Sequence, residues 1–568
     1  MPSLYVPRYE DLIGEAPKCT CSGDALDCLC RCSLMYMSPE LVEPDFCKEA
    51  SETKIDVCKP LKEPATIASH LHELQAKNAA ARRRVIQSVC MLYLGSLSFG
   101  ITAVYSAPAL PDIRKNMEFS KDSGDWFGSV LNIGGVLGAI FAGYMINRVG
   151  RKRTIMMSML CFVFGWTCVM LGGHAVMLLF VGRCLSGFAV GIIALTLPVF
   201  ISEISPPDIR GQLNSASVAV LHAGILVVFV LGKWLGYVAL AGVSMIPVAL
   251  LIPCLYFIKE SPTWLLEKER KSEAVESLHF YVGPNITDDM CKLQAKISTG
   301  EQFTFSELKL PYIYKPFLCT LLAMFLQQFS GVAILLYFAH DIFEASGSTM
   351  SSSDCAITVG LVQVFTVMLS TFLTDRLGRK ILFLASVTIS SLSLLALGLC
   401  FYFKKVQGEA FVSTFGWAPV LAVSVYFFGY SLGLGGLPWV LLGEVLPQRV
   451  KGFATGFCTA FNFATGFVVV KEFQDFLHFF GSEGIYWFYS AILGLGFVLF
   501  LFFVPETKGK TLEEIEELFG KTCAEGAAPP MNVTLDALPG RRPTGVFSNA
   551  IYAEVLNGQV GMSSVETV

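Results

Sequence analysis

A short basic motif occurs twice in this chain, first as Asn147-Arg-Val-Gly-Arg-Lys152 and again as Asp375-Arg-Leu-Gly-Arg-Lys380. Each copy follows one long apolar segment and precedes another. The same charged loop therefore stands at the same place in two successive blocks of apolar segments. Two such blocks predict a duplicated bundle of membrane helices, which is how many secondary transporters are built.

The amino-acid composition is typical of an integral membrane protein. Hydrophobic residues make up 53% of the chain and charged residues only 15%, whereas a soluble domain averages about 25% charged residues. We therefore predict an all-α integral membrane protein with twelve transmembrane helices in two six-helix bundles. Runs long enough to cross the hydrocarbon layer lie near residues 88–110, 125–146, 155–174, 176–198, 214–236, 238–258, 315–339, 355–374, 381–402, 416–442, 453–473 and 485–504.

The polar segments divide the chain into five parts and orient it. We expect a tail at 1–85, a bundle at 86–258, a linker with short helices at 259–314, a second bundle at 315–505 and a tail at 506–568. Lys and Arg gather in the loops on one side, and cytoplasmic loops carry such an excess. We expect both termini and the linker to be cytosolic, the tails to be disordered and the protein to lie in the plasma membrane. The net charge of −4 gives no reason to expect a nucleic-acid partner.

An acid and a base recur after the fourth and tenth apolar runs. Glu203 precedes Arg210 by seven residues, and Glu444 precedes Lys451 by the same distance. We expect these charges to pair when the cytosolic face is shut and to separate when it opens. The alternative is that the charges only set topology, but topology requires no Glu at a fixed offset. Arg183 interrupts the fourth run; an arginine there is costly unless paired, and we expect Glu203 to be its partner near the cytosolic end.

Further motifs carry a resemblance to a known family. Over about residues 85–515 the chain resembles the sugar porter family of the major facilitator superfamily, and it is most similar to the arthropod facilitated trehalose transporters. The resemblance rests on Arg183, the two basic loops, Glu260-Ser-Pro262, Gln327-Gln-Phe-Ser-Gly331, Pro438-Trp439 and Pro505-Glu-Thr-Lys-Gly509, with Ser106-Ala-Pro-Ala109, Asn462-Phe463 and Val469-Val-Lys-Glu-Phe473 for the trehalose group.

The resemblance implies a sugar held midway through the membrane between the two bundles of a major facilitator fold. Carried over by position, the substrate-binding residues are Gln327, Gln328, Tyr337, Gln363, Gly433, Trp439 and Asn462. Amides supply paired donors and acceptors for sugar hydroxyls, although polar side chains also join membrane helices to one another. The implied cytosolic charge network is Arg148, Arg151, Arg183, Glu203, Arg210, Glu260, Asp375, Arg376, Arg379, Glu444, Arg449 and Lys451.

Several positions depart from the pattern of the glucose-type members. Val218 and Ala333 stand where those members present amides, and Gln363 replaces an Asn. Asn147 replaces the usual Asp of the first basic loop, and Lys451 replaces an Arg. A roomier, less polar pocket fits a disaccharide or another non-glucose ligand.

The first apolar run, Gly100-Ile-Thr-Ala-Val-Tyr105, contains no acid, and proton coupling in this family usually needs one there. His222 could titrate, but we interpret it as a hydrogen-bonded wall residue. The sequence therefore predicts a facilitative sugar transporter that prefers trehalose and has no catalytic residue, cofactor or metal. A hexose transporter, a sugar sensor that does not transport and a proton-coupled or organic-ion carrier remain as alternatives.

The two tails suggest partners only weakly. Seven cysteines crowd the first tail, where zinc ligation, palmitoylation or plain disorder are open readings. The chain ends Val565-Glu-Thr-Val568, which could add as a strand to a PDZ-type groove. The sequence does not predict an oligomeric state.

Overall fold

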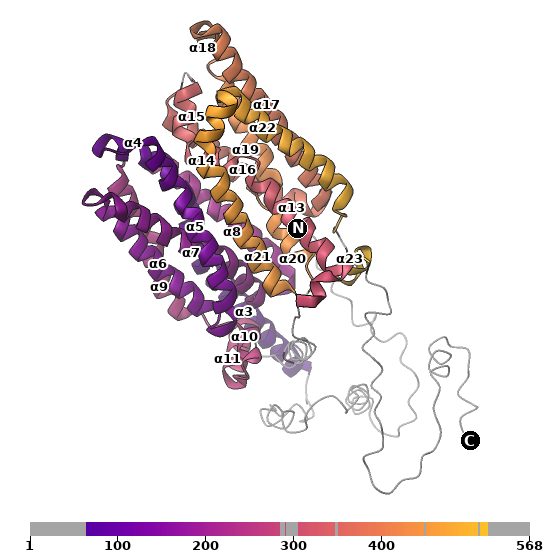
Figure 1. The fold of residues 1–568 in the computed structure, drawn as a ribbon. Helices are drawn as coiled ribbons and strands as arrows, with labels where there is room; N and C mark the ends of the chain where they lie inside the picture. The colour runs from indigo at the N-terminus through magenta and orange to yellow at the C-terminus, as the bar shows by residue number, and fades with distance from the viewer. Residues whose placement is uncertain are drawn as a thin grey trace, which may run out of the picture.

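The computed structural model describes residues 64–283, 290, 305–346, 350–447, 450–508, 510 and 512–520. Twelve helices in this part are long and apolar enough to cross a membrane, and its regular structure is helical. The helices form two groups side by side, the first half of the chain in one and the second half in the other (Figure 1). The predicted all-α fold with twelve spans is therefore confirmed.

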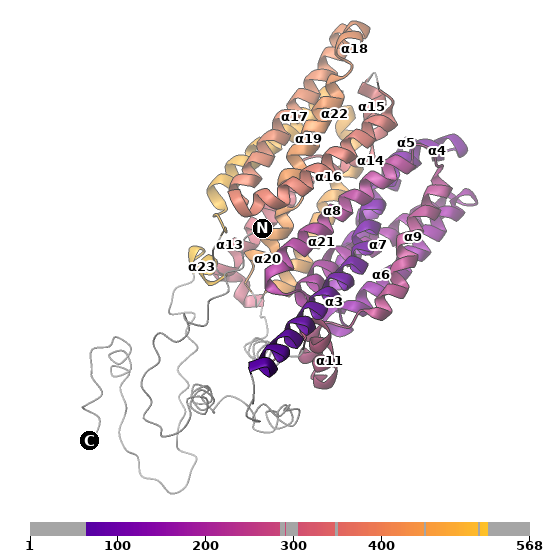
Figure 2. The same ribbon diagram turned by 180° about the vertical axis from the view of Figure 1, so that it is seen from behind.

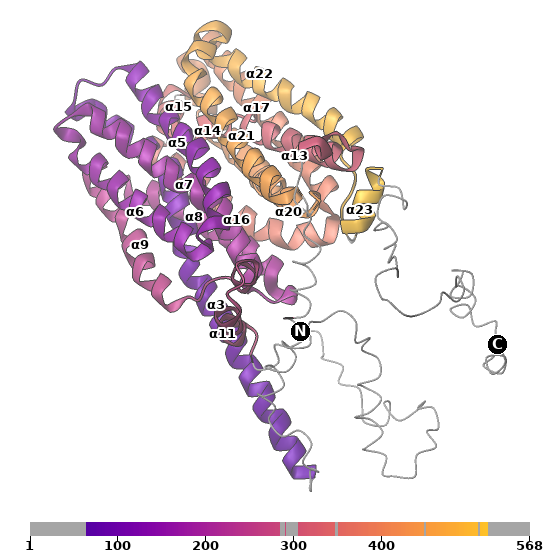
Figure 3. The same cartoon turned by 60° about the horizontal axis from the view of Figure 1, so that its bottom comes forward.

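The first group holds seven long or medium helices. They are α3 (Pro64–Val104), α4 (Ser106–Asn116), α5 (Lys121–Arg148), α6 (Arg151–Met170), α7 (Val176–Ile204), α8 (Pro207–Leu231) and α9 (Tyr237–Phe257). Two short helices of the linker follow, α10 (Pro262–Glu267) and α11 (Lys271–Tyr281). The helix α3 begins well before the predicted first span and projects beyond the bundle (Figure 3), so part of the predicted tail at 1–85 is helical.

The second group has the same succession with more interruptions. It comprises α13 (Pro311–Gln328), α14 (Val332–Tyr337), α15 (Ala339–Ser346), α16 (Ser352–Leu377), α17 (Arg379–Gln407), α18 (Glu409–Phe415), α19 (Ala418–Leu432), α20 (Leu437–Glu444), α21 (Lys451–Lys471), α22 (Phe473–Phe503) and α23 (Leu512–Leu518). The helix α23 lies within the predicted second tail. The cysteines of the first tail and the last four residues lie outside the described residues.

Three predicted continuous spans are broken in the structure. The seventh is interrupted at Gly331, whose φ of 80° is a left-handed conformation that glycine adopts without steric cost. The tenth is interrupted between α19 and α20, where Gly433 and Gly436 lie. The first breaks at Tyr105, between α3 and α4. Breaks at membrane depth occur where protein or a ligand can satisfy the freed backbone groups.

The two halves meet along two pairs of helices. The helix α5 packs on α21, and α8 packs on α16; the second contact is visible from behind in Figure 2. One buried apolar cluster runs through both halves. Large apolar side chains on the outer helices are exposed instead, Phe372 and Phe502 to 70% and 77%. Such a belt fits the lipid environment that the composition predicts.

Candidate functional site

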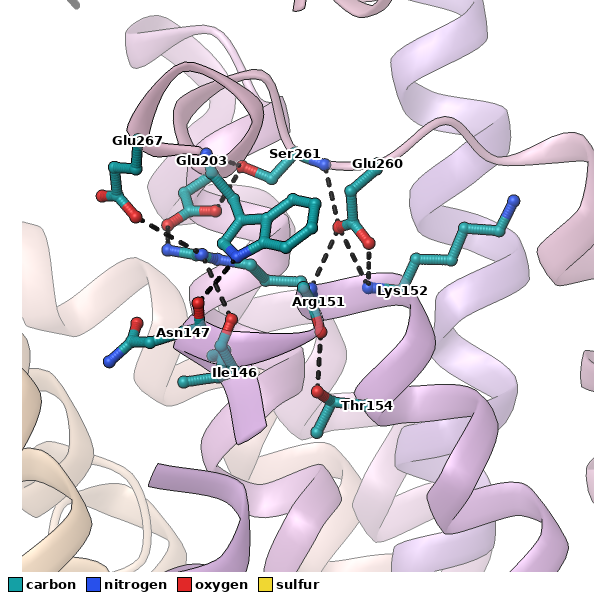
Figure 4. Close-up of polar contacts among 11 residues, drawn as sticks. Ile146, Asn147, Arg151, Lys152, Thr154, Glu203, Glu260, Ser261 and Glu267 are labelled. Atoms are coloured by element: carbon teal, nitrogen blue, oxygen red, sulfur yellow. Dashed lines mark hydrogen bonds and ion pairs between the residues drawn. The ribbon is translucent and has the colours of Figure 1, made fainter. Parts of the chain in front are cut away.

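The first basic loop anchors a cluster of charges at one end of the first half (Figure 4). Arg151, at the start of α6, places Nη2 2.7 Å from Glu203 Oε1 in the last turn of α7. The Arg151 side chain is only 6% exposed. A buried guanidinium needs a paired carboxylate to offset the loss of water, so this pair holds the ends of α6 and α7 together. We call this end of the molecule the basic-loop end.

Glu260 joins the linker to the same cluster. Its carboxylate accepts hydrogen bonds from the backbone N–H groups of Arg151, at 3.0 Å, and Lys152, at 3.1 Å. These are the free N–H groups of the first turn of α6, where a negative charge is favoured. The next residue, Ser261, donates its hydroxyl to Glu203 Oε2. The two acids, the arginine and the serine thus form one connected network.

The second half repeats this network residue for residue. Arg379 Nη2 lies 2.9 Å from Glu444 Oε1. Glu506 accepts from the backbone N–H groups of Arg379, at 2.9 Å, and Lys380, at 3.0 Å. Thr507 donates its hydroxyl to Glu444 at 3.1 Å. The duplication seen in the sequence is therefore a duplication of contacts.

Three members of these networks were not among the predicted residues. Ser261, Glu506 and Thr507 lie in the motifs Glu260-Ser and Glu506-Thr, which follow the sixth and twelfth spans. The acid-hydroxyl pair at the same place in each half was the signal that could have identified them. Their role became clear only from the folded chain, which brings each pair to the first turn of a helix remote in sequence.

Glu203 and Arg210, seven residues apart, do not pair with each other in this conformation, and their pairing when the basic-loop end is shut stays a prediction. Glu203 pairs with Arg151, while Arg210 donates to the carbonyl of Ser205. Arg148 stacks on Tyr144, 4.6 Å from the ring centre. In the second half Arg376 is exposed, Arg449 lies outside the described residues, and the side chains of Asp375 and Lys451 are not described either.

The predicted position and partner of Arg183 are wrong. Arg183 lies in the second turn of α7, towards the end of the molecule opposite the basic loops, and Glu203 lies about 30 Å further along the helix. Arg183 is fully buried and donates to the carbonyl of Thr102 at 3.0 Å and to Ser106 Oγ at 2.9 Å. Its guanidinium also faces the rings of Tyr105 and Phe127. The error came from reading the direction of the fourth span the wrong way round.

Within the described ranges, three ion pairs connect the halves at the end opposite the basic loops. They are Arg114–Asp341 at 3.0 Å, Lys471–Asp122 at 3.1 Å and Lys233–Asp354 at 2.5 Å. At the basic-loop end, the Arg151–Glu203 and Arg379–Glu444 pairs each lie within one half. The opposite end is thus the one that is tied across the two halves in this conformation.

A cluster of amides lies midway between the two ends. Asn462 donates to Gln327 Oε1 at 2.7 Å, and Gln328 donates to Asn462 Oδ1 at 2.9 Å. Gln327 in turn donates to the carbonyls of Leu434 and Gly435, both at 2.9 Å. These carbonyls belong to the break between α19 and α20, so Gln327 satisfies backbone groups that the broken helix leaves free. The structure therefore brings three predicted residues together, and the side chain of Gln327 makes its hydrogen bonds to other residues of the protein.

The other four predicted residues have different surroundings. Gln363 is 1% exposed, and its Nε2 has no hydrogen-bond partner among the described residues. Tyr337 is buried beside Gly128 of α5. Gly433 permits close packing, because a Cβ there would lie 2.8 Å from Ser386 Cβ. Trp439 packs at the edge of an apolar cluster that contains Met324, which also contacts Asn462.

Comparison with known proteins assigns the family. The family model described as "Sugar (and other) transporter" matches residues 87–519. The chain belongs to this sugar transporter family. The match includes both charge networks and all seven predicted substrate-binding residues.

Relatives within the family are insect proteins named facilitated trehalose transporter Tret1. The protein from Anopheles gambiae is 36% identical over 74% of this chain, and that from Aedes aegypti is 35% identical over 74%. The chain spans about half the length of these two, 54% and 53%. The Tret1 of Apis mellifera ligustica is 34% identical, with 78% of this chain and 90% of that protein covered.

Solved structures of the same fold are those of the bacterial xylose transporter XylE. The proton:xylose symporter bound to 6-bromo-6-deoxy-D-glucose superposes with a TM-score of 0.65 at 22% identity, covering 77% of this chain and 99% of that one. The inward open form from E. coli gives 0.64 at 22% identity, with 76% and 99% covered. At this identity the likeness establishes the fold of this sugar transporter family member.

Proposed function

We propose that this sugar transporter family member is a facilitative transporter that carries trehalose down its concentration gradient by alternating access. The amide cluster at mid-depth is the observation that carries the proposal. Amides both donate and accept, as the vicinal hydroxyls of a sugar require. Relatives at about 35% identity that are named trehalose transporters support the choice of substrate. We place the protein in the plasma membrane with both termini cytosolic.

Uniport rather than proton coupling is supported by the surroundings of Arg183. Its hydrogen-bond partners, a backbone carbonyl and a serine hydroxyl, are both uncharged. A proton carrier must lose and regain a proton during the cycle, and neither partner can do so near neutral pH. His222, the titratable residue considered in the fifth span, contacts the carbonyl of Val218 at 2.9 Å, as expected of a hydrogen-bonded wall residue.

Alternating access is supported by the distribution of ion pairs. Charges that tie the two halves together lie at the end opposite the basic loops. Release of those pairs and rotation of the halves would expose the amide cluster to that side. A substrate with equal affinity for both conformations leaves their balance unchanged, so net flux follows concentration alone.

Uptake of radiolabelled trehalose and glucose into oocytes tests the substrate. We expect saturable trehalose uptake that excess glucose inhibits weakly, with and without a protonophore. If the protein reaches the cell surface and transports glucose but not trehalose, the substrate is a hexose. Surface-exposed protein that binds trehalose without moving it would make the chain a sensor instead.

A further inference from the structure

Two buried amides at the interface of the halves each have a side-chain nitrogen with no hydrogen-bond partner among the described residues. They are Asn132 in α5, which is 3% exposed, and Gln363 in α16, which is 1% exposed. In both, the nitrogen that should donate is unpaired within the described structure. A buried amide without a partner loses the hydrogen bonds that water would give it, so such a group requires an explanation. Gln363 belongs to the predicted sugar site, and Asn132 does not.

Asn132 lies on the face of α5 that meets the second half. One turn earlier on this face, Gly128 packs near Tyr337, and one turn later Gly135 packs against Phe463. The α5 helix thus presents a glycine, an amide and a glycine to α14 and α21. Asn132 is the polar group at the centre of this contact.

The amide of Asn132 points at the cluster described above. A Cβ built on Gly466 would lie 3.3 Å from Asn132 Oδ1 and 3.2 Å from Gln328 Oε1, so these two oxygens converge over the same glycine. Tyr337 is close enough for its hydroxyl to interact with the Asn132 side chain, although the Nδ2 group makes no hydrogen bond of normal geometry. Asn132 therefore extends the polar surface of Gln328 and Asn462 into the first half.

The two unpaired amides lie at similar depths in the two halves, although they are not at equivalent positions of the repeat. Asn132 is in the second span of its half and Gln363 is in the second span of the other. Both stand about three to four helical turns before the basic loop of that half, which is mid-depth in the membrane. An unpaired donor in each half at this depth suits a polar ligand held between the halves.

We propose that Asn132 is a substrate-contacting residue that determines sugar specificity, with Nδ2 donating to a sugar hydroxyl and Oδ1 accepting from one. This inference rests on the proposed sugar transport. It supplies from α5 the polar contact that Val218 in α8 and Ala333 in α14 do not offer. A role only in joining helices does not account for the position, because such a role would use the donor that is unpaired here.

The test combines three variants with modified sugars. Purified wild type, Asn132→Leu and Asn132→Ala are compared for affinity towards trehalose and a set of mono-deoxy trehaloses, and for KM and kcat of trehalose uptake in proteoliposomes. Ser129→Ala is the matched control, because Ser129 is buried on the same helix and bonds only to its own helix, at Trp126 O. Elution as a single peak in gel filtration confirms that each variant is folded.

We expect both Asn132 variants to bind trehalose about tenfold more weakly than wild type, because each loses one hydrogen bond to the sugar. The kcat for trehalose uptake should change little. Wild type should bind one of the deoxy trehaloses about tenfold more weakly than trehalose. Asn132→Leu should bind that deoxy trehalose and trehalose equally, because removal of the hydroxyl and removal of the amide abolish the same contact. Equal affinity of all variants for every sugar, or a fall in kcat for trehalose at unchanged KM, would overturn the inference while leaving the transport function intact. Wild type that binds none of the sugars would overturn both.

Discussion

Glu260 and Glu506 make the same contacts in the two halves, yet their pKa values shift in opposite directions. Burial raises the pKa of Glu260 above its usual value of 4.5, despite the backbone N–H groups that it accepts from. Burial also acts on Glu506, but four backbone N–H groups together hold its pKa below 4.5. The more exposed copy is therefore the one whose carboxylate is better stabilised. The duplicated network does not respond to pH as a symmetrical unit.

Acidification should loosen the second network and leave the first intact. A carboxyl group whose pKa is raised in the packed state binds its proton more tightly there, so the packed state of Glu260 becomes more stable as pH falls through that raised pKa. The pKa of Glu506 is lowered in the packed state, so the packed state of Glu506 loses stability as pH falls below 4.5. Amide hydrogen exchange, corrected for its intrinsic pH dependence, should therefore stay constant at Arg379 and Lys380 down to pH 4.5 and rise below it. It should not rise at Arg151 and Lys152 over the same range. Glu506→Gln should abolish the difference. Parallel behaviour of the two helix starts would contradict this asymmetry.

At the scale of the helices, Arg183 acts as a joint for the broken first span. It donates both to the last turn of α3, at Thr102 O, and to the first residue of α4, Ser106. Carbonyls in the last turn of a helix are short of donors, so the arginine stabilises the place where the span breaks. A positive charge in the membrane is tolerated here because it faces carbonyl, hydroxyl and aromatic groups.

Removal of this joint should destabilise the first half. Arg183→Met leaves the Thr102 carbonyl without its donor and should cost about 1–3 kcal/mol, whereas Ser106→Ala should cost about 1 kcal/mol. Both should lower the thermal unfolding midpoint in detergent, in that order, and Arg183→Met should also slow trehalose flux. Ser98→Ala is the control, since Ser98 bonds only within its own helix, to Leu94 O. An Arg183→Met protein as stable as this control would show that the joint contributes nothing.

The sequence predicted features that repeat and missed features that depend on local breaks. The basic motifs at 147–152 and 375–380 were sufficient to predict two bundles and the start of each charge network, because charge placement follows topology. The break at Gly433 to Gly436 was not predictable from hydropathy, since the segment is apolar throughout. The role of Gln327 as a donor to the carbonyls of this break was therefore not predicted either. Arg183 was placed at the wrong end because the fourth span runs towards the basic loops, so a residue near its start lies at the opposite end. The role proposed for Asn132 was not predicted, because no motif marks this residue.

For the whole molecule, the balance between conformations depends on ion pairs that are individually weak. Arg114–Asp341 and Lys471–Asp122 cross between the halves with partly exposed side chains, and such pairs contribute about 0–1 kcal/mol each. Arg114→Ala with Lys471→Ala should therefore shift the population by a few-fold towards opening of that end. Raised salt should have the same effect, since it screens exposed charges.

Spin labels at Glu118 and Glu409, both exposed at that end, would report the shift as a longer mean distance. Lys405→Ala is the control, because its pair with Glu483 at 2.6 Å joins helices of one half. An unchanged distance distribution in the double variant would mean that packing of α5 on α21 and of α8 on α16, rather than charge, keeps the end closed.

The central claim is facilitative trehalose transport, and its most direct test is the end point of uptake into proteoliposomes. Purified protein is reconstituted without other components, and internal trehalose is measured after equilibration, with and without an imposed pH gradient. We predict that internal trehalose rises to the external concentration and stops there, with the same end point in both conditions. Accumulation above the external concentration when the outside is acidic would contradict the account and establish a proton-coupled carrier.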